Sequence, residues 1–449
     1  MAGSGLEEWL HASGLEAKLA AVCADNSIKE ASVAIACGQS SRFLRANSDG
    51  LADDDDSMVT LTGCLTKSFT ASALATTLKA GDLSPSVPIG TLAPGAHGIL
   101  AHERVRPLTP IQLLTHTHGL DDSALDREWT FESAALDREV DAMAMVRVPP
   151  LYEPGALHSY GSGGATLAAL LTEHLTGSSY EQVLQAELLD KLGLTRIHRD
   201  ALGDDTVTLR AICPAIGATF ALSMRDIVTY VRWHIGLMQP EPAEPLASVP
   251  ALLRSQHIEL PGWSPFERAI CLGWKYFGSD WYGHNANICG HSLIVRFAPK
   301  SAALLVIAAR NEPMDAALTV LINLFGKCLP EFSQLRIPRR LNSSEAAELI
   351  ARQYEGSYAN ARDLIRISAD DRQQLTLQFT ALPGDVRVAE CGLSPAQRSI
   401  FFSQPATRDI PPYIQFGGAD SAGHFQYVWN GKKVWPRRAV AAAAADSPT

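Results

Sequence analysis

The 449-residue sequence has little charge and lacks the segments that direct a protein into or across a membrane. Charged residues make up only 19% of it. The first residues include neither a basic segment nor a long apolar one, and no stretch is apolar for long enough to span a bilayer. These absences predict a cytoplasmic protein, although a mature chain that had lost its signal would look the same.

Patterned cysteines are also absent. The eight cysteines are scattered without a Cys-x-x-Cys pair, which excludes a disulfide framework and a zinc site of the usual spacing. No histidine and carboxylate set has the spacing of metal ligands, so we predict neither a metal nor a cofactor. The net charge of -10, without any basic cluster, argues against nucleic acid as a partner.

What is present is enough apolar material for a large core. Hydrophobic residues make up 46% of the chain, and the length favours two or three domains. Apolar spacing predicts helices and β-branched runs predict strands. The expected helices span residues 5–25, 107–120, 165–175, 223–233 and 316–325, and a further helix begins at Cys64. Thr109 is the expected N-cap of the second of these helices, with Pro110 as its first residue. The expected strands span residues 32–37, 42–46, 58–61, 272–277, 293–297 and 302–309, and the last three, around a polar loop, are expected to be adjacent and antiparallel.

From about residue 337 the sequence alternates short β-like runs with turns. This pattern predicts a small antiparallel β domain over residues 337–440, after a larger domain over residues 1–336. The alanine-rich end, residues 441–449, is predicted to be disordered.

A potential nucleophile and a potential base lie three positions apart at the start of the predicted central helix. Cys64 and Lys67 would share one helix face, because residues i and i+3 are neighbours there. By themselves, these two residues are better explained as an ordinary buried cysteine beside a solvent-facing lysine.

Several separated segments change that interpretation. Residues 64–67 align with a Ser-x-x-Lys motif, and residues 113–120 with a leucine-rich His-Thr-Ser-Gly-Leu segment. Residues 153–162 align with a Pro-Gly…Tyr-x-Asn segment, and residues 284–286 with a His-x-Gly strand motif. With these motifs, residues 20–330 resemble the serine β-lactamase and penicillin-binding-protein superfamily, in its class C-like branch of esterases, D-amino-acid peptidases and acyltransferases.

The resemblance implies an α/β (α+β) fold in which helices flank an antiparallel sheet and a helical subdomain completes a cleft. The small C-terminal β domain resembles the lipocalin-like appendage of some members. Cys64 would attack a carbonyl, while Lys67 and Tyr160 share the proton. The backbone N–H groups of Cys64 and of a strand residue near Asn287 would form the oxyanion hole.

The substrate-binding residues implied by the resemblance are Ser162, His284, Asn285 and Asn287. Ser162 replaces the family's asparagine and has a shorter reach, while His284 would orient the substrate or tune Tyr160. Ala286 stands where the family has glycine and would narrow the cleft. His118 replaces a serine and is predicted to be a packed residue, and His116, His158 and His291 are predicted to be structural histidines.

Cysteine in place of the family's serine leaves three interpretations of residue 64. It is a working thiol nucleophile, an engineered replacement of serine, or part of a decayed site. We favour the first, because Lys67 and Tyr160 are both retained and because a thiol at a helix N-terminus beside a lysine ionises readily.

The sequence therefore predicts a cytoplasmic acyltransferase that forms an acyl intermediate on Cys64. Its partners would be a small-molecule acyl donor, either an activated ester or a thioester on an acyl carrier protein, and an alcohol or amine acceptor, as in natural-product biosynthesis. The alternatives are an ester or amide hydrolase with the same site, and a non-catalytic binding protein on this fold. β-Lactamase or cell-wall peptidase activity is disfavoured, because His284 stands where a lysine would recognise the substrate carboxylate.

Overall fold

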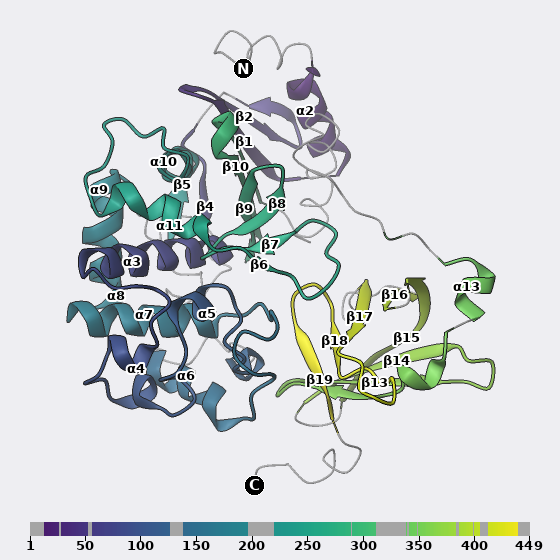
Figure 1. The fold of residues 1–449 in the computed structure, drawn as a ribbon. Coiled ribbons are helices and arrows are strands. Elements are labelled where there is room, and N and C mark those ends of the chain that lie inside the picture. The colour runs from purple at the N-terminus through teal and green to yellow at the C-terminus, as the bar shows by residue number, and fades with distance from the viewer. Residues whose placement is uncertain are drawn as a thin grey trace.

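A computed structural model describes most of the chain. The described residues are 13–26, 28–52, 56–125, 138–195, 220–288, 290–310, 338, 341–347, 349–382, 386–397, 399–404 and 412–438. They form a helical region, a large antiparallel sheet and a closed barrel (Figure 1). The α/β architecture and the separate small β domain agree with the sequence prediction.

The large sheet has nine antiparallel strands in the order β3-β2-β1-β11-β10-β9-β8-β7-β6. Its centre is strongly apolar because both faces are covered. Val33 and Ile35 of β1 pack with α2, whereas Ala34 and Ala36 face the main helical core. The strands are β1 (Glu30–Cys37), β2 (Ser40–Asn47), β3 (Gly50–Ala52), β6 (Ile258–Glu259), β7 (Ala269–Ile270), β8 (Lys275–Gly278), β9 (Trp281–Ile288), β10 (His291–Ala298) and β11 (Ala303–Arg310). A separate ribbon pairs β4 (Val59–Leu61) with β5 (Ala221–Ser223).

Helix α3 (Thr66–Ala80) is the central helix of the helical region, and nearly all of its residues are buried. Its alanine, serine and threonine side chains are small, so that α7 (Gly163–Thr176) approaches closely. The hydroxyls of Thr70 and Thr76 donate to carbonyls one turn earlier, which removes the cost of burying them. The other helices are α2 (Leu15–Asp25), α4 (Ile89–Leu92), α5 (Pro110–Leu114), α6 (Arg138–Arg147), α8 (Tyr180–Val183), α9 (Asp190–Leu192), α10 (Met224–His234), α11 (Val249–Ser255) and α13 (Ser343–Ala347).

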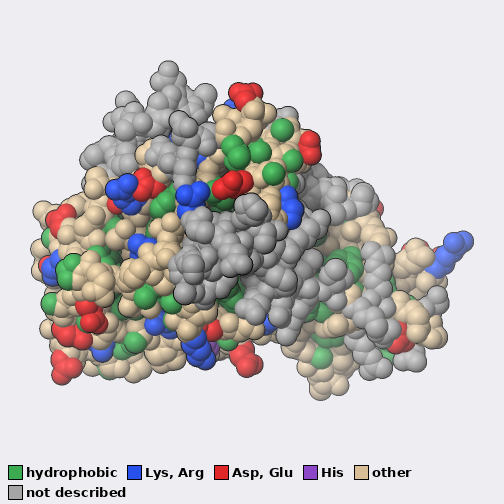
Figure 2. All heavy atoms as spheres, turned by 90° about the horizontal axis from the view of Figure 1, so that it is seen from above, with side chains coloured by type: hydrophobic (Ala, Val, Ile, Leu, Met, Phe, Trp, Pro, Cys, Tyr) green, Lys and Arg blue, Asp and Glu red, His purple; other side chains and the backbone are tan. Residues whose placement is uncertain are grey.

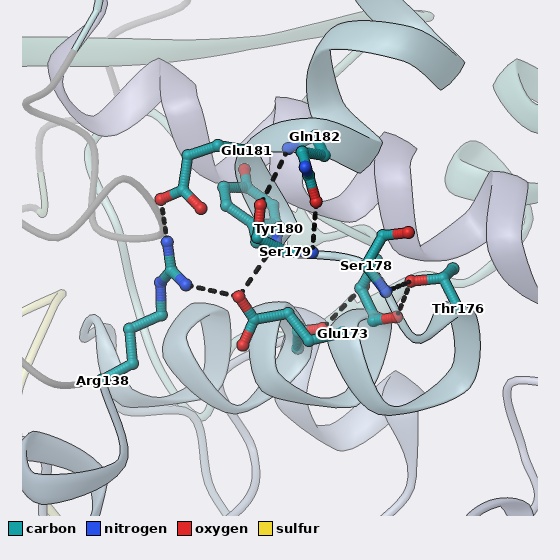
Figure 3. Close-up of polar contacts among 10 residues, drawn as sticks. Arg138, Glu173, Thr176, Ser178, Ser179, Tyr180, Glu181 and Gln182 are labelled. Atoms are coloured by element: carbon teal, nitrogen blue, oxygen red, sulfur yellow. Dashed lines mark hydrogen bonds and ion pairs between the residues drawn. The ribbon is translucent and has the colours of Figure 1, made fainter.

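Polar contacts hold α6, α7 and α8 together at one corner of this region (Figure 3). Arg138 of α6 donates to Glu173 of α7 at 2.6 Å and also to Glu181 of α8. Ser179 and Gln182 form a reciprocal cap at the start of α8. The helices that surround α3 therefore have defined ends.

The C-terminal region is a closed antiparallel barrel of eight strands. Aromatic side chains, among them Tyr354, Phe401 and Phe416, pack against one another in its core. The strands are β12 (Gly356–Ala359), β13 (Asp363–Ala369), β14 (Leu375–Ala381), β15 (Val386–Gln397), β16 (Ile400–Gln404), β17 (Tyr413–Gly417), β18 (Tyr427–Trp429) and β19 (Val434–Arg438).

One predicted strand pairing is wrong. Residues 272–277 and 293–297 were expected to be adjacent strands around a polar loop, but that loop contains β9, which lies between β8 and β10. The apolar pattern failed there because polar residues such as His284 and Asn285 occupy a strand whose side chains alternate between two faces. The ladder between β9 and β8 ends at Gly283.

Two predicted helices differ in length. Thr109 caps α5 and Pro110 opens it, as expected, but the helix ends at Leu114 because His116 has a φ of 56°. The first predicted helix is observed as α2 from Leu15 onwards. Residues 5–12, the predicted helix 316–325, most of the acidic run at 53–56 and the tail 441–449 lie outside the described residues.

Acidic and basic side chains are interspersed over the face seen in Figure 2, without one continuous patch of either sign among the described atoms. Within the described ranges, no helix is both long enough and apolar enough to cross a bilayer.

Candidate active site

Cys64 lies in the single turn Gly63–Leu65 that leads directly into α3, and it is half-buried. Gly63 has a φ of +47°, which favours glycine. A Cβ at this position would lie 3.0 Å from the Cβ of Ala286 and 3.1 Å from Cγ2 of Ile288. The turn is therefore pressed against β9, and the backbone of Cys64 lies beside that strand.

Lys67 and Tyr160 meet beside Cys64. Lys67 is in the first turn of α3, is 4% exposed, and places Nζ 5.2 Å from the centroid of the Tyr160 ring. The Tyr160 hydroxyl interacts with Cys64 but meets normal hydrogen-bond geometry with no described residue. Such looseness is common for catalytic contacts before a substrate binds. The structure thus brings the three predicted catalytic residues together.

The loop that presents Tyr160 is held by His116. The carbonyl of His116 accepts from Ser159 N at 3.0 Å, and its Nδ1 lies 3.4 Å from Gly161 N. The rings of His116 and Tyr160 are 4.6 Å apart. His116 was predicted to be a structural histidine, and its contacts show what it supports: the orientation of the Tyr160 loop.

The predicted substrate-binding residues are not all on one side of β9. His284 faces the site, with its ring 6.1 Å from that of Tyr160, and Ser162 begins α7 two residues after Tyr160. Side chains alternate along a strand, so Asn285 and Asn287 lie on the opposite face from His284 and Ala286. The register supports this, because Asn285 is paired with Ile294, which belongs to the core around α2. The side chains of Asn285 and Asn287 therefore lie on the face of β9 that points away from Tyr160.

Positive charge surrounds the thiol of Cys64. Burial alone would raise its pKa, but Lys67, the nearby Tyr160 hydroxyl, Lys275 and Lys432 together lower the pKa below its ordinary value. The pKa of Tyr160 is raised well above its ordinary value by burial and by the nearby Cys64. The site therefore favours a thiolate beside a neutral phenol.

The histidines around the site are held neutral. Burial, followed by the nearby His158 and Lys67, lowers the pKa of His116 well below its ordinary value. Burial and Lys275 do the same to the pKa of His284. These rings can accept or donate hydrogen bonds at neutral pH without adding charge.

His158 provides a test of this burial. Its Nδ1 lies 3.0 Å from the carbonyl of Thr115, and burial lowers its pKa from 6.5 to about 4. The His158 ring binds its proton at higher pH in the unfolded chain than in the folded chain. Its contribution to the free energy of unfolding is therefore complete above pH 6.5 and is lost as the pH falls towards 4. The loss from this residue is about 3 kcal/mol.

We expect His158→Asn, which keeps a donor for Thr115, to flatten the decline in unfolding free energy between pH 6.5 and 4. The measurement is denaturant unfolding over that range. His174→Asn is the matched control, since His174 is exposed at the end of α7. Equal slopes for wild type and His158→Asn would contradict the expectation.

The barrel contacts the active-site loop, which the sequence did not predict. The carbonyl of Lys432, in the turn between β18 and β19, accepts from Tyr160 N at 2.7 Å. Val434 N donates to Ser159 Oγ at 3.3 Å, and Ala361 N donates to Asp121 Oδ2 at 2.7 Å. The barrel turn therefore forms part of the active-site wall. No local pattern could have indicated this, because the contacts join residues more than 200 positions apart.

Lys275 and Glu267 were also missed. They form a largely buried ion pair of 2.7 Å, and Lys275 Nζ lies 5.4 Å from the centroid of the Tyr160 ring. Both lie in or near short strands whose sequences indicate no special role. Within the described residues, no three His, Cys, Asp or Glu side chains gather as a metal site would require.

The chain is similar in sequence to known proteins. A family model described as Beta-lactamase matches residues 54–327. Penicillin-binding protein 4 of Amycolatopsis lactamdurans is 27% identical over 318 residues, which cover 64% of this chain and 81% of that protein.

Solved structures share the fold. The crystal structure of SurE with D-Leu has a TM-score of 0.71 at 19% identity and covers 96% of this chain and 100% of its own. A D-stereospecific amidohydrolase from Streptomyces sp. has a TM-score of 0.54 at 18% identity, over 70% of this chain and 98% of its own. The SurE match extends across nearly the whole chain, barrel included.

Proposed function

The chain belongs to the β-lactamase family, in the superfamily of serine β-lactamases and penicillin-binding proteins, and from that premise we propose that it is an acyltransferase with Cys64 as its nucleophile. The observation that supports this most directly is the arrangement of Cys64, Lys67 and Tyr160. A half-buried thiol with a lowered pKa lies beside a lysine and a neutral phenol. A lowered pKa raises the fraction of the side chain that is thiolate, which is the nucleophilic form of cysteine.

In the first half-reaction, the Cys64 thiolate attacks the carbonyl carbon of the donor ester or thioester. A new C–S bond forms, and the bond from that carbon to the leaving oxygen or sulfur breaks. Lys67, through Tyr160, supplies the proton to the leaving group. The backbone N–H of Cys64, with one from β9 near Asn287, would stabilise the oxyanion, which is consistent with Gly63 packing against Ala286.

In the second half-reaction, an amine or alcohol attacks the acyl-Cys64 thioester. The new C–N or C–O bond forms as the C–S bond breaks, and the acceptor's proton passes to Tyr160 and Lys67. Thioesters react with amines more readily than oxygen esters do, so cysteine in place of serine favours transfer over hydrolysis. The donor would be an activated small-molecule ester or a thioester on an acyl carrier protein, and a role in natural-product biosynthesis follows from that donor chemistry.

The acyl group we propose is a peptide or amino acid with a D-configured residue at the reacting carbonyl. The similar structures include SurE with D-Leu and a D-stereospecific amidohydrolase. The printed pairing of β9 with β8 ends at Gly283, and we propose that an extended acyl chain lies along the following part of β9, beside the turn that bears Cys64. Hydrolysis is the second candidate, because the neighbours of this fold include an amidohydrolase and a D-amino acid amidase.

The test uses matched D- and L-aminoacyl N-acetylcysteamine thioesters and intact-protein mass spectrometry. We expect a mass increase equal to the acyl group, located on Cys64 and formed faster from the D-donor. Added amine should then clear the adduct faster than water does. Clearance by water at the same rate would favour the hydrolase, and the absence of any adduct with any donor would favour a binding protein.

A further inference from the structure

The ion pair between Lys275 and Glu267 occupies an unusual position. Lys275 is on β8 and Glu267 lies just before β7, and their side chains are 13% and 15% exposed. Glu267 also accepts from Ser264 Oγ at 2.5 Å. Removing two charges from water costs more than their attraction usually returns, so a buried pair is poorly explained by stability alone.

The pair adjoins the catalytic phenol. Lys275 Nζ is 5.4 Å from the centroid of the Tyr160 ring, and Lys67 Nζ is 5.2 Å from the same centroid. Two ammonium groups therefore lie against one phenol, although the proton transfers described above need only Lys67. The second ammonium is the feature that the proposed reaction does not use.

The geometry points to Lys275 as a positioning residue that stabilises the Cys64 thiolate by its charge, with Glu267 limiting how much of that charge reaches the sulfur. This inference rests on the proposed role of Cys64 as nucleophile. Lys275 does not exchange a proton with substrate in this scheme. It acts through the electrostatic field at Tyr160 and Cys64.

The other groups around Cys64 come from each packed element. They are Lys67 from α3, Tyr160 from its loop and Lys432 from the barrel turn, while His116 and His284 are neutral. The positive charge of Lys275 lowers the pKa of Cys64 and helps to lower the pKa of His284, as expected for a nearby cation. Burial opposes ionisation of Glu267, but its pairing with Lys275 lowers the pKa of Glu267 to about 2, so the pair is ionised at neutral pH.

An electrostatic role and a purely structural role of the Lys275–Glu267 pair predict different directions of change in the pKa of Cys64 when one partner is removed. If Lys275 acts by its charge, removing that charge makes the thiolate harder to form. Removing the charge of Glu267 exposes the sulfur to more of the lysine's field and makes the thiolate easier to form. A pair that only supports the fold would disturb the site in the same direction whichever partner is removed.

The experiment measures alkylation of Cys64 by iodoacetamide against pH, with the peptide containing Cys64 quantified by mass spectrometry. We expect Lys275→Met to raise the midpoint of the profile by roughly one pH unit. Lys275→Arg, which keeps the charge, should remain near wild type, and Glu267→Gln should lower the midpoint. Lys300→Met is the matched control, because Lys300 is exposed at the far end of the sheet.

Equal midpoints for wild type and Lys275→Met would overturn the inference, as would an equal rise in Lys275→Met and Lys275→Arg or a rise in Glu267→Gln. The alkylation profile needs no acyl donor. If no donor acylates Cys64 but the midpoints shift as expected, the proposed function fails and the role of Lys275 stands.

Discussion

Replacing Cys64 by alanine is expected to abolish the acyl adduct and to reduce turnover on the order of 10⁴-fold or more. Every bond change in the proposed reaction passes through this sulfur, and neither Lys67 nor Tyr160 can replace it as the group that is acylated. The side chain is half-buried in the turn that precedes α3, so its removal should leave the fold intact. Steady-state kinetics with the preferred thioester donor and intact-protein mass spectrometry are the two measurements.

Two further variants test whether the loss in Cys64→Ala is specific to the sulfur of Cys64. Cys37→Ala removes a buried cysteine at the end of β1, away from the catalytic residues, and should leave both measurements near wild type. Cys64→Ser restores the residue type of the family and should still form an acyl-enzyme, now an oxygen ester with a lower preference for amine acceptors. Full activity in Cys64→Ala would remove the nucleophilic role assigned to this residue.

Tyr160→Phe is expected to lower kcat by roughly 10²–10⁴-fold, the usual contribution of a general acid–base group. The substitution keeps the ring that packs between Lys67, Lys275 and His116, and it keeps the backbone N–H bonded to Lys432. It removes only the hydroxyl beside the sulfur. Because binding surfaces are unchanged, KM should change far less than kcat.

The matched control is Tyr276→Phe, which removes a phenol from β8 whose ring packs against His257. It should leave kcat within a few-fold of wild type. Since Tyr160 also lowers the pKa of Cys64, the alkylation midpoint of Tyr160→Phe should rise. A fall in kcat without any change in this midpoint would point to proton delivery alone, and wild-type kcat would refute the proton-transfer role.

Local sequence was sufficient for the features that depend on short spacing. Cys64 and Lys67 share a face because they are three residues apart at a helix start, and Thr109 with Pro110 marks the start of α5. The apolar pattern did not reveal β9, because its alternation of His284, Asn285, Ala286 and Asn287 contains no apolar period, and only the resemblance to the His-x-Gly motif indicated a strand there. The same alternation separates the asparagine side chains from the site.

By itself, the sequence determined the family, the helix that begins beside Cys64 and bears Lys67, and a small β domain after the main one. Those conclusions depend on motifs and periodicities that are local to each segment. Only the tertiary structure decided which charges face the sulfur. The charges of Lys275 on β8 and of Lys432 in the barrel turn both lower the pKa of Cys64, and the barrel bonds to the backbone of Tyr160. Electrostatic fields depend on distance in space, and no spacing along the chain encodes the approach of residues 64, 160, 275 and 432.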